Sequence, residues 1–200
     1  MPASLTTALG AMAYNNAWAN HRLLTACLPL SQAAFEARRE SFFPSLSLTL
    51  NHILVVDWFY VDALEGGWLG PAAWADETPC ATAALLKAAQ AEVDARLIAV
   101  CEALTEAALG QDVRVNRGDR VQVERRDRLL LHLFQHQIHH RGQAHAMLAG
   151  AGVGPPQLDD FFSAGDAPLR AADFAALGWT EETVWGPSTA PGDAPAADGV

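Results

Sequence analysis

Four long segments of the sequence have the length and apolar spacing of α-helices, and each stops close to glycine or proline. A helix with an apolar stripe must bury that stripe against a neighbour, so four such helices within 200 residues favour a four-helix bundle. The long helices are expected at 4–28, 45–64, 79–108 and 125–149, and shorter ones at 31–40 and 168–177. We therefore predict an all-α fold built on a four-helix bundle.

One segment between the third and fourth long helices has a different period. In VRVNRGDRVQVE, residues 113–124, valines alternate with polar residues on both sides of a turn that contains glycine. This pattern is typical of a β-hairpin, so we expect a short hairpin at this place. The RGD triplet at its centre is interpreted as the turn and not as an adhesion motif.

The whole chain is expected to contain one folded domain. A length of 200 residues is typical of a single domain, and we place this domain at residues 1–185. The last segment, GPSTAPGDAPAADGV over residues 186–200, is rich in Pro, Ala, Gly and Asp. It is predicted to be disordered because it carries too few large apolar side chains to join a core.

Composition and charge exclude several classes of protein. The chain has 13 basic and 23 acidic residues, a formal net charge of −10 that would repel phosphate backbones, so nucleic acid is not an expected partner. No basic segment precedes an apolar run at the start, and no stretch has eighteen uninterrupted apolar residues, so neither a secretory signal nor a membrane span is expected. Cys27, Cys80 and Cys101 are widely spaced and odd in number, which is typical of reduced thiols in a cytoplasmic protein.

Histidines are concentrated in the fourth long helix. Five of the seven histidines lie in HLFQHQIHHRGQAH, residues 132–145. At 100° per residue, His132, His136 and His140 fall on the stripe that faces the core, whereas His145 falls on the opposite side. His139 and Gln143 also lie within the core-facing sector.

Histidines four residues apart on one helical face can bind one metal ion together. Both His132–His136 and His136–His140 have this spacing, but His132 and His140 are ~12 Å apart along the axis and cannot bind the same ion. Either pair therefore needs a ligand from another helix. His52 lies on a core-facing stripe of the second long helix, and His21 is the weaker candidate.

Burial favours a metal ion over a set of unpaired histidines. Each buried imidazole without a partner costs on the order of 1–3 kcal/mol, and one divalent ion would satisfy three of them. The alternative is a group of core histidines that are satisfied by hydrogen bonds. A helical zinc protease would need Glu at the position of Gln137, so peptide hydrolysis lacks its usual base.

Three segments together resemble the DinB family: NNAWANHRLL, SLSLTLNHILVVDWFY, and HQIHHRGQAHAML followed by AGVGPPQLD. The resemblance extends over roughly residues 5–165. It implies a four-helix bundle, often a homodimer, that binds a divalent ion, zinc or nickel, through three histidines. On this sequence those ligands are His52, His136 and His140. Some members of the family use low-molecular-weight thiols such as bacillithiol or mycothiol as cosubstrates.

Three imidazoles with open coordination positions are typical of a catalytic metal site. The predicted function is a divalent-metal-binding protein that acts as a metal-dependent thiol S-transferase on small electrophiles. The alternative is a non-catalytic metal-binding or stress-response protein, and the third hypothesis is a bundle with structural histidines and no metal. Gln143 is expected either to hydrogen-bond a metal-bound water or to orient a ligand imidazole, or else to bond a neighbouring helix.

Other residues of the helices carry further expectations. Arg141 is expected to pair with a carboxylate, and Gly142 to allow close approach of another helix. Three asparagines of the first helix, Asn15, Asn16 and Asn20, are expected either to line the mouth of a cavity in a polar network or to face solvent.

The fourth helix also predicts association. Leu130, Phe134 and Ile138 lie opposite the histidine stripe, so a homodimer is expected to cover this side, unless the hairpin or the tail covers it within one chain.

Overall fold

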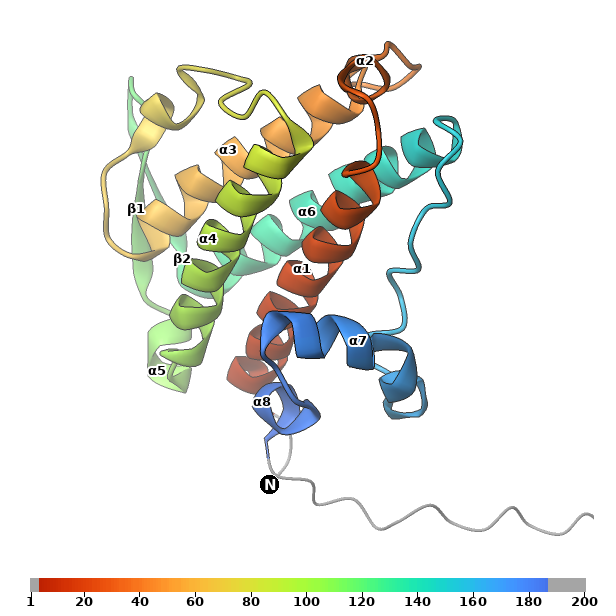
Figure 1. Cartoon of the computed structure of the whole chain (residues 1–200). Helices are drawn as coiled ribbons and strands as arrows, with labels where there is room; N and C mark the ends of the chain where they lie inside the picture. The colour runs from red at the N-terminus through yellow and green to blue at the C-terminus, as the bar shows by residue number, and fades with distance from the viewer. Residues whose placement is uncertain (1–3, 187–200) are drawn as a thin grey trace, which may run out of the picture.

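The computed structural model describes residues 4–186, and four long helices form its central bundle (Figure 1). These helices are α1 (Leu5–Cys27), α3 (Leu46–Leu64), α4 (Ala83–Glu102) and α6 (Arg126–Ala149). Helix α1 packs against α4, helix α3 packs against both α4 and α6, and α1 also contacts α6. The predicted all-α four-helix bundle is confirmed.

Serine or threonine side chains cap the N-termini of three of these helices. Ser4, Ser45 and Thr82 precede α1, α3 and α4, and each accepts a hydrogen bond of 3.1–3.2 Å from the backbone N–H three residues later. Such caps satisfy a backbone donor that has no partner inside the helix. They explain why α1 and α3 begin within one residue of the positions expected from the sequence.

The third long helix is shorter than predicted. Instead of one helix over 79–108, the chain forms α4 and then a separate turn, α5 (Glu106–Leu109). Before the N-terminus of α4, the Asn51 side chain accepts a hydrogen bond from the N–H of Cys80 and donates one to its C=O, which holds Cys80 outside the helix. At the other end, the Thr105 hydroxyl accepts from the N–H three residues later and starts a new helix.

The short helix expected at 31–40 is also shorter, because α2 spans only Gln32–Glu36. The backbone is extended at Ala37, and the guanidinium of Arg39 donates to the carbonyl oxygen of Ala37. The backbone N–H of Arg39 then donates to the carbonyl of Pro44, which turns the chain toward α3.

The predicted hairpin between the third and fourth long helices is confirmed. Strands β1 (Asp112–Asn116) and β2 (Val121–Arg125) pair antiparallel, and Gly118 has a φ of 86° in the turn. The valines of β1 are buried in the core, whereas those of β2 are exposed. The hairpin contacts α3 and the short helix η1 (Gly70–Trp74), and its tip lies beside η1 at the outer edge of the bundle (Figure 1).

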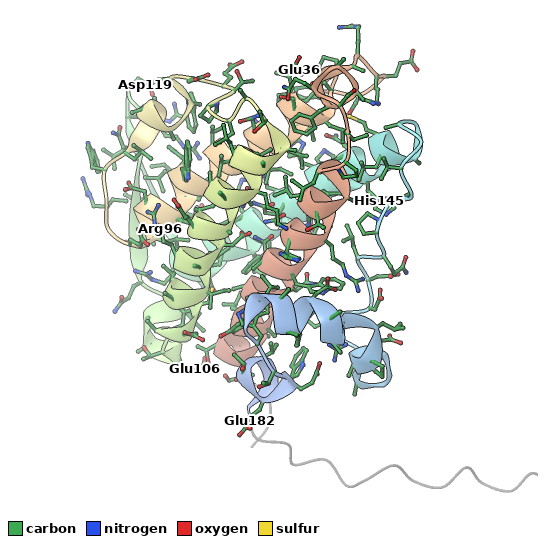
Figure 2. All side chains as sticks on the ribbon, in the orientation of Figure 1. Glu36, Arg96, Glu106, Asp119, His145 and Glu182 are labelled. Atoms are coloured by element: carbon green, nitrogen blue, oxygen red, sulfur yellow. The ribbon has the colours of Figure 1, made fainter. Side chains whose placement is uncertain are left out.

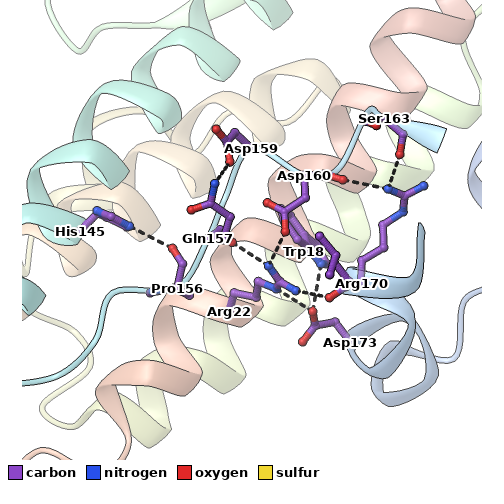
Figure 3. Close-up of polar contacts among 11 residues, drawn as sticks. Trp18, Arg22, His145, Pro156, Gln157, Asp159, Asp160, Ser163, Arg170 and Asp173 are labelled. Atoms are coloured by element: carbon purple, nitrogen blue, oxygen red, sulfur yellow. Dashed lines mark hydrogen bonds and ion pairs between the residues drawn. The ribbon is translucent and has the colours of Figure 1, made fainter. Parts of the chain in front are cut away.

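The chain after α6 returns across α1. Its elements are η2 (Ala164–Asp166), α7 (Ala167–Leu177) and α8 (Glu181–Trp185). The carboxylate of Asp173 accepts hydrogen bonds from Arg22 at 2.6 Å and from the Trp18 indole at 3.2 Å (Figure 3). These contacts hold α7 against α1, close to the position expected for the last short helix. The predicted disordered tail lies, apart from Gly186, outside the described residues.

The side of α6 opposite the histidines is partly covered within the chain. Leu130 and Phe134 are buried, whereas Ile138 is 47 % exposed. Intramolecular packing therefore covers two of the three residues that suggested a dimer, and the dimer stays a prediction. The close approach expected at Gly142 is wrong, because no atom outside its own helix backbone lies within 4 Å of the place where its Cβ would be.

Many of the charged side chains lie on the surface of the bundle, although some, such as Arg141 and Asp94, are buried. Glu36, Glu106 and Asp119 are exposed on α2, α5 and the hairpin turn (Figure 2). Within residues 4–186, no helix combines the length and the hydropathy that a membrane crossing requires.

Candidate metal centre

Three histidines from two helices converge in the bundle. His52 comes from α3, and His136 and His140 come from successive turns of α6, against which α3 packs. One ring nitrogen from each lies within 4.8 Å of the other two. The Nε2 atoms of His52 and His136 are 3.0 Å apart. The structure thus selects the pair His136–His140, and their role as metal ligands stays a prediction.

The spacing of these nitrogens suits a metal ion. Zinc–nitrogen bonds of about 2.0–2.1 Å in tetrahedral geometry place two ligand nitrogens about 3.3 Å apart. The 3.0 Å between His52 and His136 is close to that separation. Moreover, Nδ1 of His136 is buried and has no hydrogen-bond partner within residues 4–186. Within residues 4–186 its one polar contact is with His52, so the protein alone leaves this imidazole poorly satisfied.

The environment keeps the three imidazoles neutral. Burial, together with the charges of the neighbouring histidines, lowers the pKa of His136 to about 3. Burial, together with the charge of His140, lowers the pKa of His52 to about 4. Burial also lowers the pKa of His140. A neutral imidazole has a free lone pair on one nitrogen, which is the form that binds metal ions.

Gln143 orients the third histidine. Its side-chain oxygen lies 2.9 Å from Nδ1 of His140, and its amide nitrogen lies 3.2 Å from Nε2 of His139. When the Gln143 oxygen accepts the proton of Nδ1, the lone pair of His140 stays on Nε2. Of the two expected roles for Gln143 at the metal site, orientation of the imidazole is the one that this contact suits. His132 is exposed one turn before His136, and its ring contacts the ring of Tyr60.

A cavity of about 420 Å³ opens beside the histidines. Its walls are mainly apolar and come from α3, the segment before it, η1, the hairpin and α6. The lining residues are Phe43, Leu48, His52, Val55, Val56, Phe59, Tyr60, Trp74, Glu77, Arg117, His132 and His136. The ring of Phe43 lies 4.2 Å from the ring of His52, centroid to centroid, so it covers one side of the histidine group.

A buried polar network lies behind the histidines. The guanidinium of Arg141, 4 % exposed, donates to the side-chain oxygens of Asn16 and Asn20, and both asparagines donate to Asp94. The expected pairing of Arg141 with a carboxylate is not direct, because none of the ion pairs formed within residues 4–186 includes Arg141 and the two asparagines connect it to Asp94. Asn16 and Asn20 form the expected polar network, but none of the three asparagines lines the histidine cavity. The expectation that they face solvent is wrong, because Asn15, Asn16 and Asn20 are all buried.

The network carries two unusual carboxyl groups. Gln90 donates to both Asp57 and Asp94. Burial, followed by the charge of Asp94, raises the pKa of Asp57 to about 8. Burial raises the pKa of Asp94 to about 6 against the opposing effect of its hydrogen-bond donors and of Arg141. At neutral pH the network therefore holds one ionised carboxylate, one neutral carboxyl and one guanidinium, which balances its charge.

The three cysteines do not contribute to this centre. Cys27, Cys80 and Cys101 are buried and free, as the sequence predicted. Burial raises the pKa of both Cys27 and Cys101 to about 12, so these thiols stay protonated at neutral pH. His21, the weaker ligand candidate, lines a separate hollow of about 310 Å³ between α1 and α4.

Sequence reasoning missed the cationic residue of the cavity. Arg117 lines the cavity wall, whereas the sequence pattern predicts only a turn for the RGD triplet. Its neighbours Val115 and Val121 carry the hairpin signal, but a local pattern does not indicate where the tip of a hairpin docks.

Comparisons with known proteins agree with the fold. The model of the DinB family matches residues 1–168. A crystal structure of a DinB-like protein from Bacillus cereus ATCC 10987 is similar over 70 % of this chain and 90 % of that chain, with a TM-score of 0.54 and 15 % sequence identity. At this identity, the likeness concerns the fold alone. Comparison with curated proteins found no significant match.

Proposed function

The chain belongs to the DinB family, and from this premise we propose that it binds one divalent metal ion, zinc or nickel, through His52, His136 and His140. The observation that carries the proposal is the convergence of three ring nitrogens within 4.8 Å. The lowered pKa values and the unpartnered Nδ1 of His136 support it. Three protein ligands would leave at least one coordination position open toward the cavity.

We further propose that the protein is a thiol S-transferase that acts on small electrophiles. A bound divalent ion would supply Lewis-acid chemistry that favours a thiolate over a thiol at neutral pH. The sulfur must come from a small thiol, because the protein's own cysteines are buried away from the cavity lining. Val55, Val56 and Phe59 would hold the apolar part of the electrophile and exclude water. A bond forms between sulfur and the electrophilic carbon, the thiol proton is released, and any leaving group departs with the electron pair of its bond.

The residues that line the cavity bear on the alternative, a non-catalytic metal-binding or stress-response protein. Among the described residues that line the cavity, Glu77 is the sole carboxylate, and it is exposed. The position of a metalloprotease base is held by Gln137, which is fully buried. Among the described residues the cavity therefore has no buried carboxylate that could act as a base, whereas transfer of an ionised thiol does not need one.

Metal content tests the ligand set. Metal stoichiometry is measured by mass spectrometry in the wild type, in His140→Ala and in the control His145→Ala. His145 lies on the same helix but bonds the carbonyl of Pro156 outside the histidine group (Figure 3). We expect one ion per chain in the wild type and the control, and loss in His140→Ala. Equal stoichiometry in all three proteins would contradict the ligand set.

Turnover separates the enzyme from the non-catalytic protein. The assay is conjugation of a chromogenic electrophile with several thiols by metal-free, metal-loaded and His52→Ala protein. We expect rates that depend on both the metal and His52. Rates that depend on neither, for every thiol tried, would reject the transferase and leave metal binding alone.

A further inference from the structure

The histidine cavity has a cationic residue at its other end. Arg117, from the hairpin turn, lines this cavity together with Tyr60 and His132. Its Nη2 donates to the Tyr60 hydroxyl at 3.0 Å and its Nε donates to Gln122 at 2.8 Å. The guanidinium also lies over the Phe59 ring, 4.9 Å from its centroid. These contacts fix the guanidinium against the cavity wall.

The charge of Arg117 is not neutralised by the protein. Of the ion pairs formed within residues 4–186, none includes Arg117. A guanidinium has five N–H donors, and only two take part in the hydrogen bonds to Tyr60 and Gln122. The remaining donors belong to a planar fork that suits a carboxylate. Glu77 is the carboxylate on the same wall, but it is exposed, where solvent screens its charge.

The backbone of the hairpin tip is held in place. A side chain at Gly118, whose φ is 86°, would meet Pro71 at 3.1 Å, and one at Gly70 would overlap Asn116. Asn116 also donates to the carbonyl of Trp68. The tip of the hairpin is thus packed closely against the segment that contains η1, so Arg117 has a defined position above α3.

The two ends of the cavity are separated by apolar wall. Tyr60 follows His52 by two turns of α3, ~12 Å along the helix axis, and His132 precedes His136 by one turn, ~6 Å along α6. Val55, Val56 and Phe59 line the cavity between these ends. A ligand that fills it therefore meets metal-binding nitrogens at one end, an apolar middle, and a guanidinium at the other end.

We propose that Arg117 binds the carboxylate of a small thiol whose sulfur reaches the histidine site and whose apolar middle lies along α3. The inference rests on the proposed function for the sulfur end, and on Arg117 alone for the carboxylate end. It defines the class of cosubstrate as an acidic thiol with an extended apolar spacer.

The test compares two probes with the same thiol and spacer, one ending in a carboxylate and the other in a neutral ester: 8-mercaptooctanoic acid and its methyl ester. Their dissociation constants are measured by calorimetry on zinc-loaded and zinc-free protein. The variants are Arg117→Gln, Arg117→Lys and the control Arg120→Gln. Arg120 lies on the same turn but is exposed, bonds Asp119 and does not line the cavity.

We expect the wild type and Arg120→Gln to bind the acid about tenfold more tightly than the ester, as one charge-assisted hydrogen-bonded pair would give. Arg117→Gln should lose this preference while its zinc content and its affinity for the ester stay unchanged, and Arg117→Lys should keep part of it. Equal affinities for acid and ester in the wild type, an unchanged preference in Arg117→Gln, or no binding of either probe would overturn the proposal. The change in both affinities when zinc is added reports separately on the metal site. If the protein binds no zinc, the ratio of the two dissociation constants on zinc-free protein still tests the role of Arg117.

Discussion

Arg141 is expected to contribute strongly to the stability of the bundle. It is 4 % exposed and donates to Asn16, Asn20 and Gln137 from the middle of α6. Arg141→Met fills a similar volume but leaves three amide oxygens without a donor and the nearby carboxylate of Asp94 without its cation. Removing one partner from a buried charge pair typically costs about 3–5 kcal/mol.

The upper end of this range is limited by protonation. Arg141 lowers the pKa of Asp94, which is about 6 in the folded protein. Without Arg141 this pKa rises further, and Asp94 takes up a proton instead of remaining as an unpaired buried charge. We therefore expect a loss of about 3 kcal/mol at pH 7, against a typical total stability of about 5–15 kcal/mol.

Urea unfolding of the metal-free protein, followed by circular dichroism, measures the free energy of unfolding of the wild type, Arg141→Met, Asp94→Asn and the double variant. The double variant should lose less than the sum of the single losses, by about 1 kcal/mol or more, because the two residues belong to one network. Arg120→Met is the control, since its exposed pair with Asp119 should contribute little. A loss below about 1 kcal/mol in Arg141→Met, or strictly additive losses, would refute this account of the network.

Four further predictions concern stability, metal binding and association. Gly142→Ala should raise the free energy of unfolding, measured with urea, by about 0.5–1 kcal/mol, because Gly142 is exposed inside a helix and has free space for a Cβ. A less stable variant would contradict this expectation. Metal-free wild type should lose stability as the pH rises from 6.5 to 8, because the pKa of Asp57 is raised to about 8 in the folded protein. The histidines, whose pKa values are lowered in the folded protein, change stability only below about pH 6.5, where they lower it as the pH falls. Urea unfolding of Asp57→Asn should show no decline between pH 6.5 and 8. The affinity for zinc should change little between pH 7 and about pH 5, because protons compete for His52 only near its pKa of about 4. Competition with a chelator measures this affinity. A steep loss of zinc affinity around pH 6.5 would show that the histidines are not desolvated. We also propose that a homodimer covers the exposed Ile138 of α6. If light scattering finds only a species with the 21.4 kDa mass of one chain, the dimer is rejected.

Local sequence patterns determined the helices and the face on which the histidines lie. The 3.6-residue period placed His136 and His140 together on one face of α6, and serine and threonine caps set where the helices begin. Alternating valines likewise predicted the hairpin. These features depend on residues a few positions apart, so they are readable from the chain without knowing how it packs.

Tertiary packing decided what these elements bring together. Whether His132 or His140 joins His136 depended on the height at which His52 on α3 meets α6, which local spacing does not specify. The break before α4 depended on Asn51, which binds Cys80 from another helix. The position of Arg117 at the cavity depended on the docking of the hairpin on α3 and η1. Contacts between residues distant in sequence follow from how whole helices pack, and a local period carries no information about that packing.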